Sequence, residues 1–341
     1  MTPTAVQRLA RRTTAAAASA VALVVAAGAF TAPPEAAAQP AAGSPELAYV
    51  PADAVGFVHV RAADIWKSEM FTEFRKTWDR AGAKAIADLD KQFSPAPSSL
   101  ARVTGFVLMS PEKGPLPFGL VAFSAPFTPT DVAKSYLGNS RALKRSGKTI
   151  YIAPQGGDVA LYFPDNKHIL VGTKEGMAEY LAKPVEKQGP MAAALKLAAG
   201  GKSIVAAANV AALPIPPGAL NDLPPQVQPL LKADQVVLAV DIGKETTVDL
   251  RAGYADVAAA TDAEKAVRDL VKLGRDEIAK AKKELEAKLN DPDADTPRKA
   301  QDLPEAVGAV FALGALGRVD DLLADKQLVT RDGKALAFTA T

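Results

Sequence analysis

Residues 123–131 read Phe-Ser-Ala-Pro-Phe-Thr-Pro-Thr-Asp, and residues 254–262 read Tyr-Ala-Asp-Val-Ala-Ala-Ala-Thr-Asp. In both stretches an aromatic residue closes a predicted strand, and Thr-Asp follows after six residues at a predicted helix. The two stretches are 131 residues apart. A strand-to-helix step that recurs in this way indicates an internal duplication, in which one unit is used twice. Two unrelated halves with similar hydrophobic spacing are the alternative.

The predicted strands around these two steps follow the same order. β-branched and aromatic residues predict strands at 55–60, 103–109 and 118–123, and again at 203–210, 235–242 and 246–254. Further strands are predicted at 149–153, 158–163 and 168–172, and segments 327–330 and 333–338 at the chain end resemble 150–153 and 158–163. We therefore expect an α+β fold of two similar halves, 48–189 and 190–341, each an antiparallel sheet with helices packed on one face.

Apolar spacing predicts three main helices. The first covers 65–92 with Asp64 as its N-cap, and a short one runs from the cap Thr128 to Leu137. The third is a long charged helix at about 262–289, opened by a capping box from Thr261 to Glu264. The narrow apolar side of this helix needs a partner to pack against. We expect that partner to be the following segment, 303–323, or another molecule, either a protein or a component of the cell envelope.

The N-terminus has the order of a secretory signal peptide. Three arginines precede an uncharged, alanine-rich stretch, and small residues follow at 36–38. We expect residues 1–38 to be removed, residues 39–47 to form a Pro/Ala-rich linker, and the mature protein to be periplasmic or extracellular, without stable membrane insertion. A retained membrane anchor is the alternative.

Composition excludes several classes of protein. The chain contains no cysteine, so thiol nucleophiles, disulfides and iron–sulfur clusters are excluded. Of the 40 basic and 38 acidic side chains, residues 1–38 hold three Arg and one Glu, which leaves 37 of each. A neutral chain without a basic surplus does not fit a nucleic-acid-binding protein.

The chain has only two histidines, His59 and His168, and they are the first candidates for a metal site. Alternation in the strand 55–60 puts His59 on the face opposite Val58 and Val60, and we expect the valines to face the core. His168 follows a turn-like sequence and is predicted to begin a strand. Three alternating carboxylates, Asp291, Asp293 and Asp295, are a further candidate metal site, although the loop lacks the glycine and glutamate of a calcium-binding EF-hand.

Other motifs indicate structure rather than chemistry. Gly-Lys-Thr at 147–149 and Gly-Lys-Ser at 201–203 lack the first glycine of a phosphate-binding loop and are predicted turns before strands. Four aromatic side chains at helical spacing are predicted to pack against a sheet: Trp66, Phe71, Phe74 and Trp78. No catalytic motif was found, so no catalytic or cofactor-binding residue is assigned.

The stretch Tyr49-Val-Pro-Ala-Asp-Ala-Val-Gly-Phe-Val-His-Val60 resembles the start of a group of uncharacterised exported bacterial proteins. They have a Pro-Ala-Asp-type opening turn and duplicated α+β halves. The resemblance implies export and architecture only, since that family has no known catalytic residues to carry over.

Together these observations predict an exported, non-enzymatic binding or structural scaffold without a cofactor. Its contact surface would be the long helix 262–289 or the seam between the halves. A metal-assisted hydrolase using His59, His168 and nearby carboxylates is one alternative. A carrier of a small apolar ligand, held between sheet and helices, is another.

Overall fold

The computed structural model describes residues 43–72, 75–76, 83–153, 158–213, 227–289, 316–317, 320–321, 323–325 and 328–340. The predicted signal peptide lies outside these residues. The chain divides into two compact units. The first holds the described residues up to Leu270 together with 328–340, and the second holds the remainder of the long helix with the described residues between 316 and 325.

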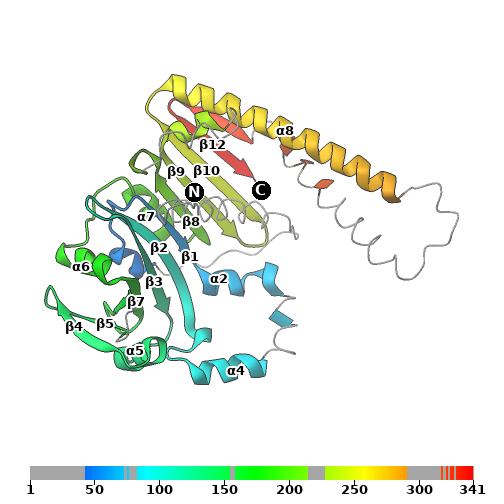
Figure 1. The fold of residues 1–341 in the computed structure, drawn as a ribbon. Helices are drawn as coiled ribbons and strands as arrows, with labels where there is room; N and C mark the ends of the chain where they lie inside the picture. The colour runs from blue at the N-terminus through cyan, green and yellow to red at the C-terminus, as the bar shows by residue number, and fades with distance from the viewer. Residues whose placement is uncertain are drawn as a thin grey trace, which may run out of the picture. The chain divides into compact units, whose positions relative to one another are not determined.

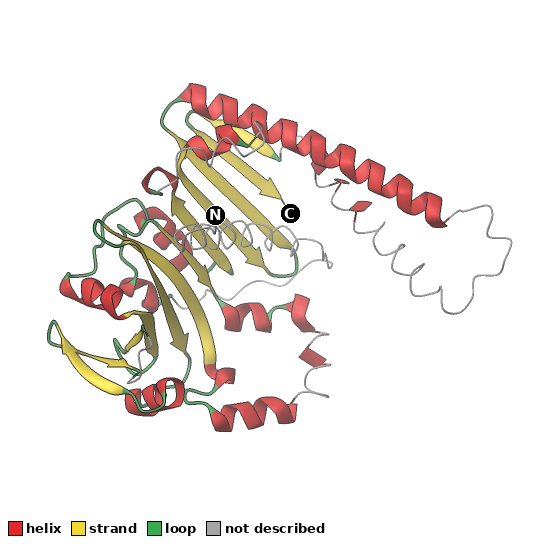
Figure 2. Cartoon of the chain, in the orientation of Figure 1, coloured by secondary structure: helices red, strands yellow, loops and turns green. Residues whose placement is uncertain are grey.

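All strands of the first unit form one antiparallel sheet (Figures 1 and 2). The strands are β1 (Gly56–Val60), β2 (Leu100–Ser110), β3 (Gly114–Phe123), β4 (Arg141–Arg145), β5 (Lys148–Ile152), β6 (Val159–Tyr162), β7 (His168–Thr173), β8 (Ile204–Asn209), β9 (Ala233–Ile242), β10 (Thr246–Tyr254), β11 (Val329–Asp332) and β12 (Ala335–Ala340). Their order is β11-β12-β10-β9-β8-β1-β2-β3-β7-β6-β5-β4. The α+β class with antiparallel strands is confirmed, but the halves share one sheet instead of having one each.

The halves meet where β1 pairs with β8. Val58 lies opposite Ala206 in this pair, which we call the seam. Read outward from the seam, the order is β1-β2-β3-β7-β6 on one side and β8-β9-β10-β12-β11 on the other. This agreement supports the predicted duplication. It also corrects the matching of the chain end, because β11 and β12 occupy the places of β6 and β7, not of β5 and β6.

The described helices are α2 (Ala62–Lys67), α4 (Ala83–Gln92), α5 (Pro129–Leu137), α6 (Lys174–Ala182), α7 (Ala192–Ala199) and α8 (Val257–Leu289), with 3₁₀ helices η1 (Pro45–Tyr49), η2 (Glu69–Phe71), η3 (Pro97–Ser99), η4 (Val210–Ala212) and η5 (Gln228–Lys232). None of these helices combines the length and apolar character needed to cross a membrane.

Helices cover both faces of the sheet, not one face as predicted. We call the face that carries Phe57 the inner face and the face that carries Val58 the outer face. Buried side chains of η1, α6 and α7 pack with Phe57 on the inner face. Helix α5 packs on the outer face, where Val132 contacts a cluster that includes Ile169 of β7. The core therefore has two layers in the first half.

Local sequence explains several elements. Thr128 precedes Pro129 at the start of α5, and the side chain of Thr173 accepts a hydrogen bond from the amide of Gly176 at 3.0 Å to cap α6. Ser146 and Gly147 have φ values of 48° and 75°, as a two-residue hairpin turn between β4 and β5 requires. The Gly-Lys-Thr at 147–149 is thus a turn, as predicted.

Two predicted elements differ from the structure. The helix expected over 65–92 is interrupted, since α2 ends at Lys67 and Ser68 is extended with ψ of 156°. Arg61, not Asp64, is its N-cap. The long loop expected at 110–117 is also wrong, because β2 and β3 extend almost to a tight turn, and Pro115 lies within β3. That part of β3 precedes its pairing with β7, so the missing N–H of proline is tolerated.

The long helix α8 begins earlier than the capping box predicted. Asp256 accepts a hydrogen bond from the amide of Ala259 at 2.8 Å, which makes it the cap. Thr261 lies inside the helix, and its hydroxyl donates to the carbonyl of Val257. The predicted pair of Glu264 with Arg268 is present at 2.9 Å. The residues that resemble a capping box lie inside this helix, so the predicted start was about one turn too late.

The apolar side of α8 faces the segment after the helix, as predicted. A side chain at Gly274 would lie 3.8 Å from Leu323. Asp320 accepts hydrogen bonds from Arg275 at 2.9 Å and from Lys282 at 3.2 Å. These contacts place Asp320 and Leu323 alongside the second half of the helix.

Candidate functional site

His59 lies in a buried polar cluster on the inner face of the sheet. Its Nδ1 shares a hydrogen bond of 2.8 Å with the hydroxyl of Thr104 on β2. Its Nε2 lies 3.8 Å from the carboxylate of Glu46 and 3.5 Å from the hydroxyl of Ser44. Glu46 in turn lies 3.5 Å from the guanidinium of Arg102. The cluster joins η1 to the two central strands.

The cluster is closed to solvent. The side chains of His59 and Glu46 are both 0% exposed. The prediction that Val58 and Val60 face the core and that His59 lies on the open face is therefore wrong. Alternation identified which residues share a face, but Phe57 and η1 determine that the face of His59 is the inner one.

Electrostatics keep the imidazole of His59 neutral. Burial lowers its pKa to about 4, and the charges of Arg102 and Arg61 act in the same direction. Neither oxygen of Glu46 accepts a hydrogen bond from the described residues. Nη1 of Arg61 donates no hydrogen bond to them. The cluster is closed to solvent and holds η1 against the two central strands.

His168 belongs to a separate group at the start of β7. Its Nδ1 donates to the carboxylate of Asp165 at 2.7 Å, and Asp165 also accepts from the hydroxyl of Tyr49 at 3.1 Å. Burial raises the pKa of Asp165, but hydrogen bonds from Lys167, His168 and Tyr49 outweigh it, so the net pKa is lowered. Burial and the bond to Asp165 raise the pKa of Tyr49 to about 12. Asp165 therefore fastens the turn before β7.

The two histidines are far apart. β2 and β3 lie between β1 and β7, so about 14 Å separates the strands of His59 and His168 at roughly 4.8 Å per strand. One metal ion cannot bind both, since metal–nitrogen bonds are about 2 Å long. Among the described residues no three His, Asp or Glu side chains could hold a metal ion. Asp291, Asp293 and Asp295 lie outside the described residues.

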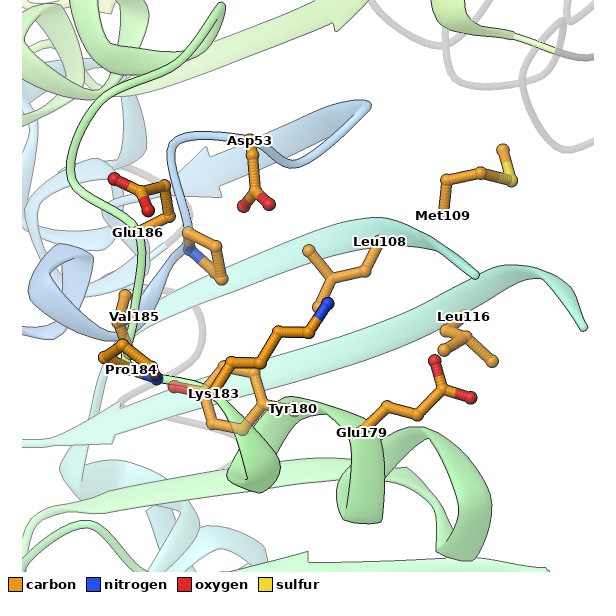
Figure 3. Close-up of a pocket in the computed structure, with 11 residues that line it drawn as sticks. Asp53, Leu108, Met109, Leu116, Glu179, Tyr180, Lys183, Pro184, Val185 and Glu186 are labelled. Atoms are coloured by element: carbon orange, nitrogen blue, oxygen red, sulfur yellow. The ribbon is translucent and has the colours of Figure 1, made fainter. Parts of the chain in front are cut away.

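A pocket of about 270 Å³ lies near the turn that joins β2 and β3 (Figure 3). Its floor is apolar, formed by Leu108 of β2, Leu116 of β3 and the ring of Tyr180 on α6. The hydroxyl of Tyr180 donates to the carbonyl of Tyr49 at 2.8 Å. Burial raises the pKa of Tyr180 far above its ordinary value, so the phenol stays protonated.

Charged side chains surround this floor. Glu179 lies 3.0 Å from the ammonium of Lys113, and its pKa is lowered by that contact. Glu186 accepts hydrogen bonds from backbone amides of its own loop. Asp53 and Lys183 also line the pocket, and Figure 3 shows their side chains entering it from different walls. The pocket thus combines an apolar floor with charges of both signs.

The outer face of the sheet carries a continuous apolar surface. Cross-strand neighbours share a face, so the registers define three rows across β10, β9, β8, β1 and β2. The rows are Val248-Val240-Ile204-Val60-Val103, Leu250-Leu238-Ala206-Val58-Gly105 and Ala252-Val236-Ala208-Gly56-Val107. No side chain at these 15 positions carries a charge or a hydrogen-bonding group. We call these residues the apolar face.

The apolar face is partly exposed to solvent. Val58 is 41% exposed and Leu250 is 36% exposed, and only Val240 of the 15 residues is buried. Phe57, on the inner face of the same strand, is buried. Helix α5 packs on the outer face of β6 and β7, and Glu264 of α8 pairs with Arg331 of β11 at 2.8 Å, so described helices flank the apolar face on both sides.

Its extent suits an interaction surface. Five strands at about 4.8 Å and three alternate positions at about 3.4 Å per residue give roughly 24 Å by 20 Å, or about 500 Å². The largest apolar patch on a typical monomer covers about 300–600 Å² and is often functional. A standard protein interface buries about 800 Å² per partner, so the face could provide its apolar centre.

The predicted aromatic stripe is not a buried core. Trp66 is exposed, with its ring 6.4 Å from that of Phe71, and the side chains of Phe74 and Trp78 lie outside the described residues. α2 contributes no buried residue. The prediction that Trp66 packs into the core is therefore wrong.

Glu46 was not predicted as part of this cluster, because residues 39–47 were expected to be a linker. Arg102, just before the predicted strand 103–109, was not singled out either. The linker prediction is wrong from Ser44 onward, because Ser44, Glu46 and Leu47 are buried. Ser44 before Pro45 is a helix-start pattern, the same one that correctly placed α5 at Thr128 and Pro129. That signal would have identified η1.

No family model matches the chain, and no curated protein matches it. Among solved structures, crystal form III of TP0453 is similar with a TM-score of 0.40 and 12% sequence identity. The alignment covers 89% of this chain and 95% of that chain.

Proposed function

We propose that the chain is an exported, non-enzymatic scaffold that binds another protein, in the periplasm or outside the cell, through the apolar face at the seam. The single observation that carries this is the row through Leu250, Ala206 and Val58, which is apolar throughout and exposes Leu250 and Val58 to solvent. The N-terminal signal pattern supports export.

The chemistry of the face defines its partner. Without a charged or hydrogen-bonding side chain, the face has nothing to recognise phosphate or an acidic peptide. Small ligands bind in concave pockets, whereas a broad sheet face suits a broad protein surface. The partner that fits presents an apolar, uncharged surface, as in sheet-on-sheet packing at about 10 Å.

Alternation along β10 supports this assignment. Val248, Leu250 and Ala252 face outward, whereas Asp249 and Arg251 lie on the other side of the strand. A strand with one apolar and one polar side is typical of a sheet that buries its apolar side. The long helix α8 remains a second proposed contact, since Leu273 is exposed on it.

The hydrolase alternative loses its support because His59 is closed to solvent and distant from His168. The carrier alternative keeps one supporting observation, the pocket beside Tyr180, which lies between the sheet and α6 as that hypothesis requires.

The experiment is affinity capture from cell-envelope extract with the mature chain, comparing wild type, Val58→Asp and the control Val159→Asp. Val159 on β6 is 45% exposed, so both variants place a carboxylate at a solvent-exposed strand position. We expect one protein to be captured by wild type and by Val159→Asp, and lost with Val58→Asp. Equal capture by all three, or no capture by wild type, refutes the proposal.

Two further measurements decide the kind of partner. Sedimentation of the mature chain alone reports self-association, and a dimer that Val58→Asp abolishes would replace the foreign protein by a second copy. Flotation with neutral phosphatidylcholine vesicles reports lipid binding, and binding lost with Val58→Asp would replace it by a membrane. Either result overturns the proposal of a foreign protein partner.

A further inference from the structure

The pocket beside Tyr180 is lined by two charged side chains that form no ion pair with the described residues. Glu179 is paired with Lys113 and accepts a hydrogen bond from Ser110 at 3.2 Å, and Glu186 is occupied by amides of its own loop. Asp53 and Lys183 make no hydrogen bond or ion pair with the described residues. The charge of Lys183 helps to lower the pKa of Glu179, but its ammonium makes no ion pair. One solvent-exposed carboxylate and one solvent-exposed ammonium therefore line the pocket (Figure 3).

The walls that carry these charges are fixed in place. The amide of Ala52 donates to the carbonyl of Glu186 at 2.8 Å, and the amide of Met191 donates to the carbonyl of Ala52 at 2.9 Å. The turn holding Asp53 is thus tied to the segment that follows Lys183. A preformed site binds without the cost of ordering its walls.

The volume sets the size of the ligand. Pockets for drug-sized ligands measure about 300–1,000 Å³, and this one holds about 270 Å³. Its apolar floor of Leu108, Leu116 and Tyr180 accepts a short hydrocarbon group. A ligand of this size that satisfies both charges must itself carry an ammonium and a carboxylate.

We propose that this pocket binds a small zwitterion with an apolar side chain, in its simplest form a free α-amino acid such as leucine. The ligand's carboxylate pairs with Lys183, its ammonium pairs with Asp53, and its side chain lies on the apolar floor. A ligand with only one charge makes one of these two ion pairs, which weakens binding. The proposal is independent of the apolar face.

The test is titration calorimetry of the mature chain with L-leucine, 4-methylpentanoic acid and isopentylamine. The acid is leucine without its amine, and the amine is leucine without its carboxylate. We expect millimolar or tighter binding of leucine and about tenfold or weaker binding of the two analogues, the loss of one charge-assisted hydrogen bond.

The variants Lys183→Met and Asp53→Asn should each weaken leucine binding by about tenfold. Lys187→Met, four residues from Lys183 and outside the pocket lining, serves as the control and should bind as wild type does. Circular dichroism verifies folding of each variant. No heat of binding with leucine, equal binding of all three compounds, or equal affinity of Lys183→Met and Lys187→Met overturns the proposal.

Discussion

The buried imidazole of His59 makes the stability of the fold depend on pH. Its pKa is about 4 in the folded chain and about 6.5 when unfolded. Above pH 6.5 the residue is neutral in both states. Below it the unfolded chain binds a proton that the folded chain excludes, so stability falls as pH decreases toward 4 and then levels off.

The size of this effect follows from the two pKa values. Between pH 7 and pH 4.5, unfolding should become about 2.5 kcal/mol more favourable through His59 alone, at about 1.36 kcal/mol per pKa unit. Carboxylates with lowered pKa, such as Asp165, lose their contribution mainly below this range. The histidine therefore dominates in mild acid.

Urea denaturation at pH 7 and pH 4.5 measures the effect. The variant His59→Gln is neutral at both pH values and keeps an amide that can bond Thr104. The free energy of unfolding of wild type should fall by about 2.5 kcal/mol more than that of His59→Gln. If wild type and His59→Gln lose the same free energy, the burial of a neutral His59 is wrong.

Two further substitutions test the packing around η1 and the pocket wall. Gly189→Ala would place a methyl group against the carbonyl of Ala52 and should lower unfolding free energy by about 1–3 kcal/mol in urea titration, whereas Gly119→Ala, which meets open space, should not destabilise the chain. Arg102→Met removes the guanidinium 3.5 Å from the buried carboxylate of Glu46 and should lower the free energy of unfolding by about 3 kcal/mol. The double variant Arg102→Met/Glu46→Gln should recover part of that loss. An unchanged urea midpoint for Gly189→Ala or for Arg102→Met would contradict the contact that the substitution tests.

Elements with strong local signals could be predicted from the sequence. The step from Phe123 to the α5 helix and the step from Tyr254 to α8 both exist, and both aromatic side chains are buried. Cap residues and strand alternation act over a few residues, so they are visible in the sequence.

Features set by distant contacts could not be predicted. The pairing of β1 with β8 joins the halves into one sheet, and nothing local distinguishes it from two separate sheets. The same limit applies to His59. Alternation grouped it with Phe57, but only the position of η1 decides that this side is buried.

The apolar face shows both situations at once. The alternation of Val248, Leu250 and Ala252 is visible in the sequence, whereas the exposure of Val58 depends on which helices reach the outer face. The pocket was also invisible, since Asp53 and Lys183 are 130 residues apart.

The proposal that the apolar face is covered by a protein partner is tested most directly by thiol labelling in intact cells. The natural chain has no cysteine, so Val58→Cys and Val159→Cys each introduce a single reactive group. We expect a maleimide that does not cross the cytoplasmic membrane to label the thiol at position 159 fully and the thiol at position 58 slowly, with both labelled equally after purification. Equal labelling at both positions in cells would contradict a covered face, and labelling at neither would contradict export.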